Sequence, residues 1–192
     1  MNRNLAPFAR KAQRIPRSLM LRFLGLEAPS DGVGRVVVIG GRQFRLHRII
    51  AQGGHATIFE ARDTASGEAL VVKQVLAQDE EAAELAEREV VTHLALDHES
   101  ILPCLGEAAE RRKDGGAEFL VLLPLITSGH LWDFASSTPM RPLAKLCALE
   151  AVASALDHMH ERCLAHLDVK LENVLVDGSG GAGVRFLLCD FG

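Results

Sequence analysis

The sequence lacks the marks of several protein classes. No apolar run approaches the roughly 20 residues that a membrane-spanning helix needs. The net charge is -4 and the isoelectric point is near 6.1, so the basic surplus of a nucleic-acid-binding domain is absent. The four cysteines form no C-x-x-C pair, which argues against a zinc site and against a disulfide framework. With 48% apolar and 24% charged residues, the composition favours a soluble globular protein with reduced thiols.

Acidic residues are also absent from the start of the chain, before Glu27. The basic residues there are Arg3, Arg10, Lys11, Arg14, Arg17 and Arg22. This composition is typical of an organelle transit peptide, a membrane-surface helix or a solvated, disordered leader, and the three alternatives stay open. N-myristoylation is excluded because Asn2 stands where glycine is required. We treat residues 1–33 as a basic leader and expect a cytoplasmic protein, with peripheral membrane association or organelle targeting as alternatives.

Short β-branched runs dominate residues 34–123. The runs on either side of Gly40-Gly41 predict a hairpin. Further strands are predicted at 57–61, 69–75, 101–102 and 119–123. Residues 79–96 predict a helix that Asp79 caps, because Leu85, Val90 and Leu94 recur at helical spacing. This region therefore predicts a small lobe made of an antiparallel sheet and one helix.

Residues 124–192 follow a different pattern. A connector near residues 124–130 precedes one long helix, predicted from Pro142 to about Arg162 by its apolar recurrence. Two strands, 174–176 and 184–189, then flank a glycine-rich turn. The predicted fold class is α+β, with this region as the start of a second, helical lobe.

The strongest chemical motif is the octet His166–Asn173, with Asp190-Phe191-Gly192 after it. Asp168 can orient a hydroxyl group, Lys170 follows two positions later and Asn173 five positions later. Asp190 arrives 22 positions after Asp168, at the end of the next predicted hairpin. Such a set suits phosphoryl transfer, in which metals and cations neutralise charge on phosphate oxygens.

In its order H-x-D-x-K-x-x-N then D-F-G, this segment resembles the protein kinase family. The resemblance covers about residues 34–192 and implies the two-lobed kinase fold, with the second lobe present only through the catalytic loop and Asp-Phe-Gly. It implies transfer of the γ-phosphate of Mg-ATP to a Ser or Thr of a protein substrate, and Lys170 favours Ser/Thr over Tyr. Asp168 and Lys170 would be catalytic, and Asn173 and Asp190 would hold Mg²⁺.

The resemblance also implies a phosphate anchor in the small lobe. Lys73 would hold the α- and β-phosphates, and Glu89, on the predicted helix, would pair with it. Taken alone, Lys73 would be a surface lysine and Glu89 a solvated acid. The phosphate-loop positions are Ala51, Gly53, Gly54 and Ala56, in which alanines replace the outer two glycines of the family's pattern. Taken alone, this stretch would be an ordinary turn.

The expected adenine site lies around the connector. The carbonyl of Pro124 and the N–H of Ile126 would face the adenine edge, since proline lacks an N–H to donate. Ile58 and Val71 would cover the base from above and Leu175 from below, and Cys189 would line the back as a buried, inert thiol. The alternative for these apolar residues is an ordinary core position.

Finer features carry further expectations. The A-Q-G-G-H-A-T-I-F-E loop and the L-L-P connector resemble the Numb-associated kinase family; an ordinary Ser/Thr kinase of another family is the alternative. Leu167 stands where most kinases have arginine, so we expect activity that does not require a phosphate paired at this position.

The chain ends at Gly192, so we expect residues 1–192 alone to be weakly folded and inactive. The competing classes are a pseudokinase or scaffold without phosphoryl transfer and a fragment of a broken gene; the oligomeric state is open.

Overall fold

The computed structural model describes residues 32–192 except positions 55, 112, 114, 138, 179–182 and 192. The predicted basic leader, up to residue 31, therefore lies outside the described residues, as do Gly192 and most of the glycine-rich turn. The strands are β1 (Val36–Ile39), β2 (Arg42–Gln52), β3 (Ala56–Asp63), β4 (Ala69–Ala77), β5 (Gly106–Arg111), β6 (Ala117–Pro124), β7 (Val174–Asp177) and β8 (Arg185–Leu188). The helices are α2 (Glu80–Ala95), α3 (Leu131–Ser137), α4 (Pro142–His160) and the 3-10 turn η1 (Leu171–Asn173).

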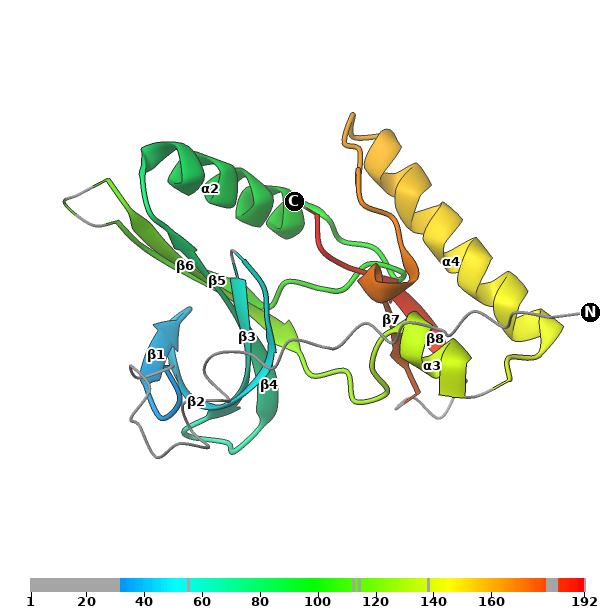
Figure 1. Cartoon of the computed structure of the whole chain (residues 1–192), viewed down its shortest axis with the longest axis horizontal. Helices are drawn as coiled ribbons and strands as arrows, with labels where there is room; N and C mark the ends of the chain where they lie inside the picture. The colour runs from blue at the N-terminus through cyan, green and yellow to red at the C-terminus, as the bar shows by residue number, and fades with distance from the viewer. Residues whose placement is uncertain are drawn as a thin grey trace, which may run out of the picture. The chain divides into compact units, whose positions relative to one another are not determined.

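Six of these strands form one antiparallel sheet in the order β1-β2-β3-β4-β6-β5 (Figure 1). The predicted hairpin is confirmed: Ile39 pairs with Arg42, so Gly40 and Gly41 form a two-residue turn. Both glycines have positive φ, 57° and 77°, which two-residue hairpin turns of the I′ type require. The glycine pair therefore sets the register of the first two strands.

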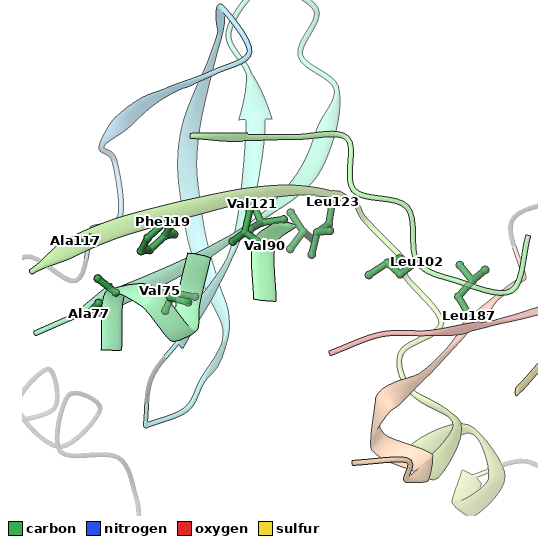
Figure 2. Close-up of a cluster of buried hydrophobic side chains, with 12 residues drawn as sticks. Val75, Ala77, Val90, Leu102, Ala117, Phe119, Val121, Leu123 and Leu187 are labelled. Carbon is green, nitrogen blue, oxygen red and sulfur yellow. The ribbon is translucent and has the colours of Figure 1, made fainter. Parts of the chain in front are cut away.

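Side-chain alternation along β4 separates two hydrophobic cores. Val71, Val75 and Ala77 lie in the cluster on the α2 face of the sheet. Leu70 and Val72 lie in the cluster on the opposite face, which Val37 and Ile39 of β1 help to form. Because side chains alternate along a strand, Lys73 has the same parity as Val71 and Val75 and points to the α2 face. Figure 2 shows the α2-face cluster, which extends from β4 and β6 to Leu102 and Leu187.

Helix α2 begins where the sequence predicts it. The Asp79 side chain accepts a hydrogen bond from the N–H of Ala82 at 2.9 Å and caps the first turn. The buried residues of α2 are Ala83, Ala86, Val90 and His93, of which the first three pack in the cluster with β4 and β6. The leucines behind the helix prediction lie elsewhere: Leu85 is 60% exposed and Leu94 46% exposed. Ala83 and Ala86 have small side chains, which permit a close approach of this part of the helix to the sheet.

The second part of the described chain has its own core. Ala148, Ala155 and Met159 of α4 pack with Val174 of β7 and Leu188 of β8. The two strands β7 and β8 form a separate antiparallel pair, as predicted. On the other side of α4, Leu143, Leu146 and Leu149 are 71%, 62% and 67% exposed. None of the helices in the described ranges is long and apolar enough to span a membrane.

Three details of the secondary structure differ from the prediction. The predicted strand at Ile101 is only an isolated bridge to Leu188, and the strand of this region is β5, which follows it. Helix α3 follows the connector directly and was not predicted, because its seven residues are too few to show a helical period. Helix α4 ends at His160, two residues before the predicted end, and Glu161 donates its N–H to the carbonyl of Asp157.

Candidate active site

Lys73 lies at the centre of a three-segment ion cluster. Its strand β4 lies between β3 and β6, with Lys73 opposite Ile58 and Val121. The Lys73 Nζ lies 2.5 Å from Glu89 Oε1 on α2 and 2.6 Å from Asp190 Oδ1 near the end of the chain. The Lys73 side chain is only 15% exposed. The predicted pair of Lys73 with Glu89 is therefore present, and Asp190 is the second partner.

The charge of Lys73 depends on these partners. Burial favours the neutral amine and lowers the lysine pKa, but the charges of Glu89 and Asp190 outweigh it. The pKa of Lys73 is raised above its ordinary value as a result. Lys73 is thus a permanent, positioned cation across the physiological pH range.

Asp190 is held in place by the residues on either side of it. Its φ of 71° lies in the left-handed region, which is strained for an aspartate. Phe191 is buried, and its ring lies 4.9 Å from the ring of His93 and 5.4 Å from that of His166. The His166 Nε2 lies 3.1 Å from the carbonyl oxygen of Cys189 and can donate to it. His166 therefore packs and hydrogen-bonds, and it helps to fix Asp190.

The catalytic-loop residues form a second charged group. The Lys170 Nζ lies 2.5 Å from Asp168 Oδ2. Asn173 donates from Nδ2 to the backbone oxygen of Asp168 at 2.9 Å and to its Oδ2 at 3.1 Å. The hydrogen bond from Lys170 lowers the pKa of Asp168, and that from Asn173 acts in the same direction. Asp168 is held as a carboxylate with a fixed orientation.

The two charged groups belong to one site. Cys189, next to Asp190, donates its N–H to the backbone oxygen of Asn173 at 2.9 Å. The hydrogen bond from Lys170 to Asp168 raises the pKa of Lys170, and the charge of Asp190 contributes to that rise. The structure thus brings together the polar residues that the sequence singled out, namely Lys73, Glu89, Asp168, Lys170, Asn173 and Asp190.

The free ligand atoms of this site fit a divalent metal. Asn173 uses Nδ2 for its side-chain hydrogen bonds, so its Oδ1 is available to a metal. Asp190 uses Oδ1 for Lys73, so its Oδ2 is available as well. In the described part of the chain no three His, Cys, Asp or Glu residues could hold a metal together. A Mg²⁺ ion here would complete its shell with water and phosphate oxygens, as Mg²⁺ commonly does.

The predicted phosphate loop connects β2 and β3. Ala51 pairs with Ile58 across the two strands, and Gly53 donates its N–H to the carbonyl of Ala56 at 2.9 Å. Gly54 precedes position 55, which lies outside the described residues. The loop therefore joins two paired strands, and one backbone hydrogen bond links its two ends.

The apolar residues assigned to the adenine site gather at one cluster. Val71 belongs to the α2-face cluster, and Ile58, Ile126 and Leu175 pack against it from three other segments. Pro124 ends β6 opposite Leu70. The adenine contacts of Pro124 and Ile126 stay a prediction.

Cys189 packs against this same cluster. Its Sγ lies 3.4 Å from the backbone oxygen of Asn173. Burial is the main cause that raises the pKa of the Cys189 thiol to about 12, which agrees with the predicted inert thiol.

His93 is the residue that the sequence analysis missed. It lies four residues after Glu89 on the buried face of α2, and its Nε2 lies 2.7 Å from the carbonyl oxygen of Leu102. Burial lowers the pKa of His93, and the charge of Lys73 acts in the same direction, so the ring is held neutral beside Phe191. The spacing of four residues from Glu89 could have indicated that His93 lies on the same face of the predicted helix.

Comparisons with known proteins agree with this geometry. The family model described as protein kinase domain matches residues 44–192. The Saccharomyces cerevisiae serine/threonine-protein kinase AKL1 is 31% identical over 83% of this chain and 16% of its own length. CBL-interacting protein kinase 4 of Oryza sativa is 32% identical over 78% of this chain and 33% of its own length. Serine/threonine-protein kinase PknJ of Mycobacterium tuberculosis is 28% identical over 78% of this chain and 25% of its own length. The chain thus spans a third or less of these relatives.

Proposed function

Because the chain belongs to the protein kinase domain family, we propose that it is the nucleotide-binding part of an ATP-dependent protein Ser/Thr kinase. The observation that carries the proposal is the contact of Lys73 Nζ with both Glu89 and Asp190, at 2.5 and 2.6 Å. An ammonium clamped in this way is an anchor for phosphate oxygens. Ser/Thr specificity is supported by the names of the relatives and by Lys170.

Each residue has a role that follows from its contacts. Glu89 fixes the ammonium of Lys73, and Lys73 binds phosphate oxygens of the nucleotide. Asp168, a carboxylate oriented by Asn173, accepts the proton of the substrate hydroxyl or orients it. Lys170, 2.5 Å from Asp168, stabilises negative charge on the transferred phosphoryl group.

The residues around the nucleotide follow the same proposal. Asn173 Oδ1 and Asp190 Oδ2 would hold a Mg²⁺ ion, which would neutralise charge on the phosphate oxygens. Ala51, Gly53, Gly54 and Ala56 form the loop over the phosphates. Ile58, Val71 and Leu175 contact the adenine faces, and Pro124 and Ile126 bind its edge.

The narrower placement is a proposal as well. The A-Q-G-G-H-A-T-I-F-E loop and the L-L-P connector support membership of the Numb-associated kinase family. The coding sequence after Gly192 tests it: an activation segment and A-P-E-like motif closer to another kinase family would contradict the placement. Cytoplasmic localisation, with membrane association or organelle targeting through residues 1–33, is a further prediction that fusion of these residues to a fluorescent protein would test.

The experiment for the proposed function is a transfer assay with the complete gene product, radiolabelled Mg-ATP and mixed protein substrates. We expect phosphoserine and phosphothreonine, and no product with Asp168→Asn. Tight Mg-ATP binding without transfer would instead support the pseudokinase alternative, and phosphotyrosine would contradict Ser/Thr specificity. We expect the chain of residues 1–192 alone to transfer little phosphate, and robust peptide phosphorylation by it would contradict that expectation.

A further inference from the structure

The loop that follows α2 is attached to α4 and β8. Leu96 and Ile101 are buried in the same core cluster as Ala155 and Met159 of α4. The backbone of this loop also bonds to β8: Leu188 donates to the carbonyl of Ser100 at 2.8 Å, and Leu102 donates to that of Leu188 at 2.9 Å. Since α2 carries Glu89, the attachment of this loop influences where Glu89 lies relative to Lys73.

His98 lies at the centre of this loop, and its neighbours define which ring nitrogen carries the proton. The Nδ1 of His98 accepts the N–H of Ser100 at 3.1 Å, so this nitrogen carries no proton. The Nε2 of His98 lies 3.2 Å from Ser154 Oγ on α4 and, in the neutral ring, is the N–H donor. A second proton on His98 would remove the acceptor of the Ser100 amide, and Ser100 is buried.

A second histidine lies against the first. The rings of His98 and His158 on α4 have centroids 4.9 Å apart. The Nε2 of His158 is buried without a hydrogen-bond partner, the one such side-chain atom found among the described residues. Protonation of His158 would therefore bury an unsatisfied N–H and place a charge against the ring of His98.

The charges around His158 shift its pKa in both directions. Burial lowers the pKa of His158, and the charges of Arg162 and His98 lower it further. Glu161 and Asp97 raise it, but the net direction is downward. Arg162 is held beside the ring because its guanidinium donates to the carbonyl of His158 at 2.9 Å.

We propose that His98 and His158 form a pH-sensitive contact that holds the loop after α2 on α4 and that weakens when the His158 ring takes up a proton. Because the folded-state pKa of His158 is depressed, the stability that the neutral ring contributes is fully present above the unfolded value near 6.5 and is lost as the pH falls from there through the folded-state pKa. Protonation of His158 loosens the loop, although Leu96, Ile101 and the backbone bonds to β8 still hold it, and the pairing of Glu89 with Lys73 weakens as a result. The local opening does not depend on the proposed function; its effect on phosphoryl transfer rests on it.

Hydrogen exchange of the complete gene product, followed by mass spectrometry at pH 7.5 and pH 5.5, tests the opening. After correction for intrinsic exchange rates, we expect the protection of a peptide covering residues 97–103 to fall up to about tenfold at pH 5.5, the range that loss of one hydrogen bond gives. A peptide from β4 is the internal reference and should keep its protection. Equal protection of the loop at the two pH values would overturn the proposal, and so would an unprotected loop at pH 7.5.

Two variants should remove the pH response of the loop, one by replacing His98 and the other by replacing His158. His98→Asn keeps an acceptor for the Ser100 amide, and His158→Phe keeps an aromatic ring without a buried polar atom. With either, we expect the loop protection to change less than about twofold between the two pH values. His160→Phe is the matched control, since His160 is an exposed histidine of the same helix, and it should keep the wild-type response. If the pH response persists in both His98→Asn and His158→Phe, another group causes it and the proposal fails.

Mg-ADP affinity at the same two pH values tests the coupling to Lys73. The wild-type protein should lose more affinity on acidification than either variant does, because titration of the nucleotide itself is common to all three. Loop opening with equal affinity losses in all three proteins would overturn the coupling. If loop protection and Mg-ADP affinity both respond to pH but the protein transfers no phosphate, the proposed function would fail and the proposed histidine contact would still stand.

Discussion

The two charged groups of the site are built in different ways. Glu89 and Asp190, the partners of Lys73, lie 16 and 117 positions away in the sequence, and the Lys73 side chain is 15% exposed. Lys170 and Asn173, the partners of Asp168, lie two and five positions away, and the Asp168 side chain is 51% exposed. The Lys73 group thus depends on the packing of three segments, whereas the Asp168 group forms within one loop that faces solvent.

Under the proposed function, this difference would separate nucleotide binding from phosphoryl transfer. A half-buried ion cluster is screened less by water than an exposed one, so each partner of Lys73 contributes more to its position and charge. An exposed carboxylate is accessible to a second substrate. Substitutions in the Lys73 group should therefore change nucleotide affinity and stability, and substitutions in the Asp168 group should change mainly the rate of transfer.

Asp168→Asn gives the largest expected effect. Without a carboxylate to accept or orient the hydroxyl proton, we expect kcat of the complete gene product to fall at least about 1,000-fold, within the range for a lost general base. The Mg-ATP dissociation constant should stay within about threefold, because Asp168 does not contact the Lys73 group. Initial-rate kinetics and calorimetric titration measure the two quantities, and a large loss of affinity would break the proposed division between the groups.

Lys73→Met should affect both binding and rate. It removes the phosphate anchor and leaves Glu89 and Asp190 facing each other without a cation between them. We expect the transfer rate to fall by about 100-fold or more, the cost of a lost electrostatic contact, together with weaker Mg-ATP binding and a lower unfolding temperature. Lys170→Met is the matched control from the exposed group, and an equal loss of unfolding temperature there would contradict the comparison.

Asn173→Ala tests the residue that connects the two groups, since Asn173 bonds to Asp168 and to Cys189, next to Asp190. The substitution removes the amide that orients Asp168 and one proposed metal ligand. We expect the Mg²⁺ concentration for half-maximal activity to rise by about tenfold, as for loss of one residue of a metal shell. Activity measured against Mg²⁺ at saturating ATP checks this, and an unchanged metal requirement would remove Asn173 from the proposed ligand set.

Treatment with a phosphatase should have the smallest effect. Leu167, at the position where most kinases have an arginine, is 90% exposed and carries no charge to pair with a phosphate. We expect phosphatase-treated and untreated gene product to differ in transfer rate by less than about twofold. A much larger loss, checked by mass spectrometry for complete dephosphorylation, would show that activity requires a phosphate after all.

Much of the fold could be predicted from local patterns. The Gly40-Gly41 hairpin, the Asp79 cap and the long helix from Pro142 were all confirmed, because each depends on residues close in sequence. Strand β5 was missed because its sequence, GEAAER, is polar and lacks β-branched residues; pairing with β6 makes it a strand. The helix α2 was predicted correctly, although two of the residues behind that prediction, Leu85 and Leu94, are exposed.

The sequence by itself determined the identities and spacings of the catalytic loop, since Asp168, Lys170 and Asn173 meet within six residues. Only the tertiary structure decided that Asp190 reaches Lys73 and that His93, Phe191 and His166 support it. The physical reason is that a contact across 117 positions has no local period or cap to signal it and forms only when separate cores bring the segments together.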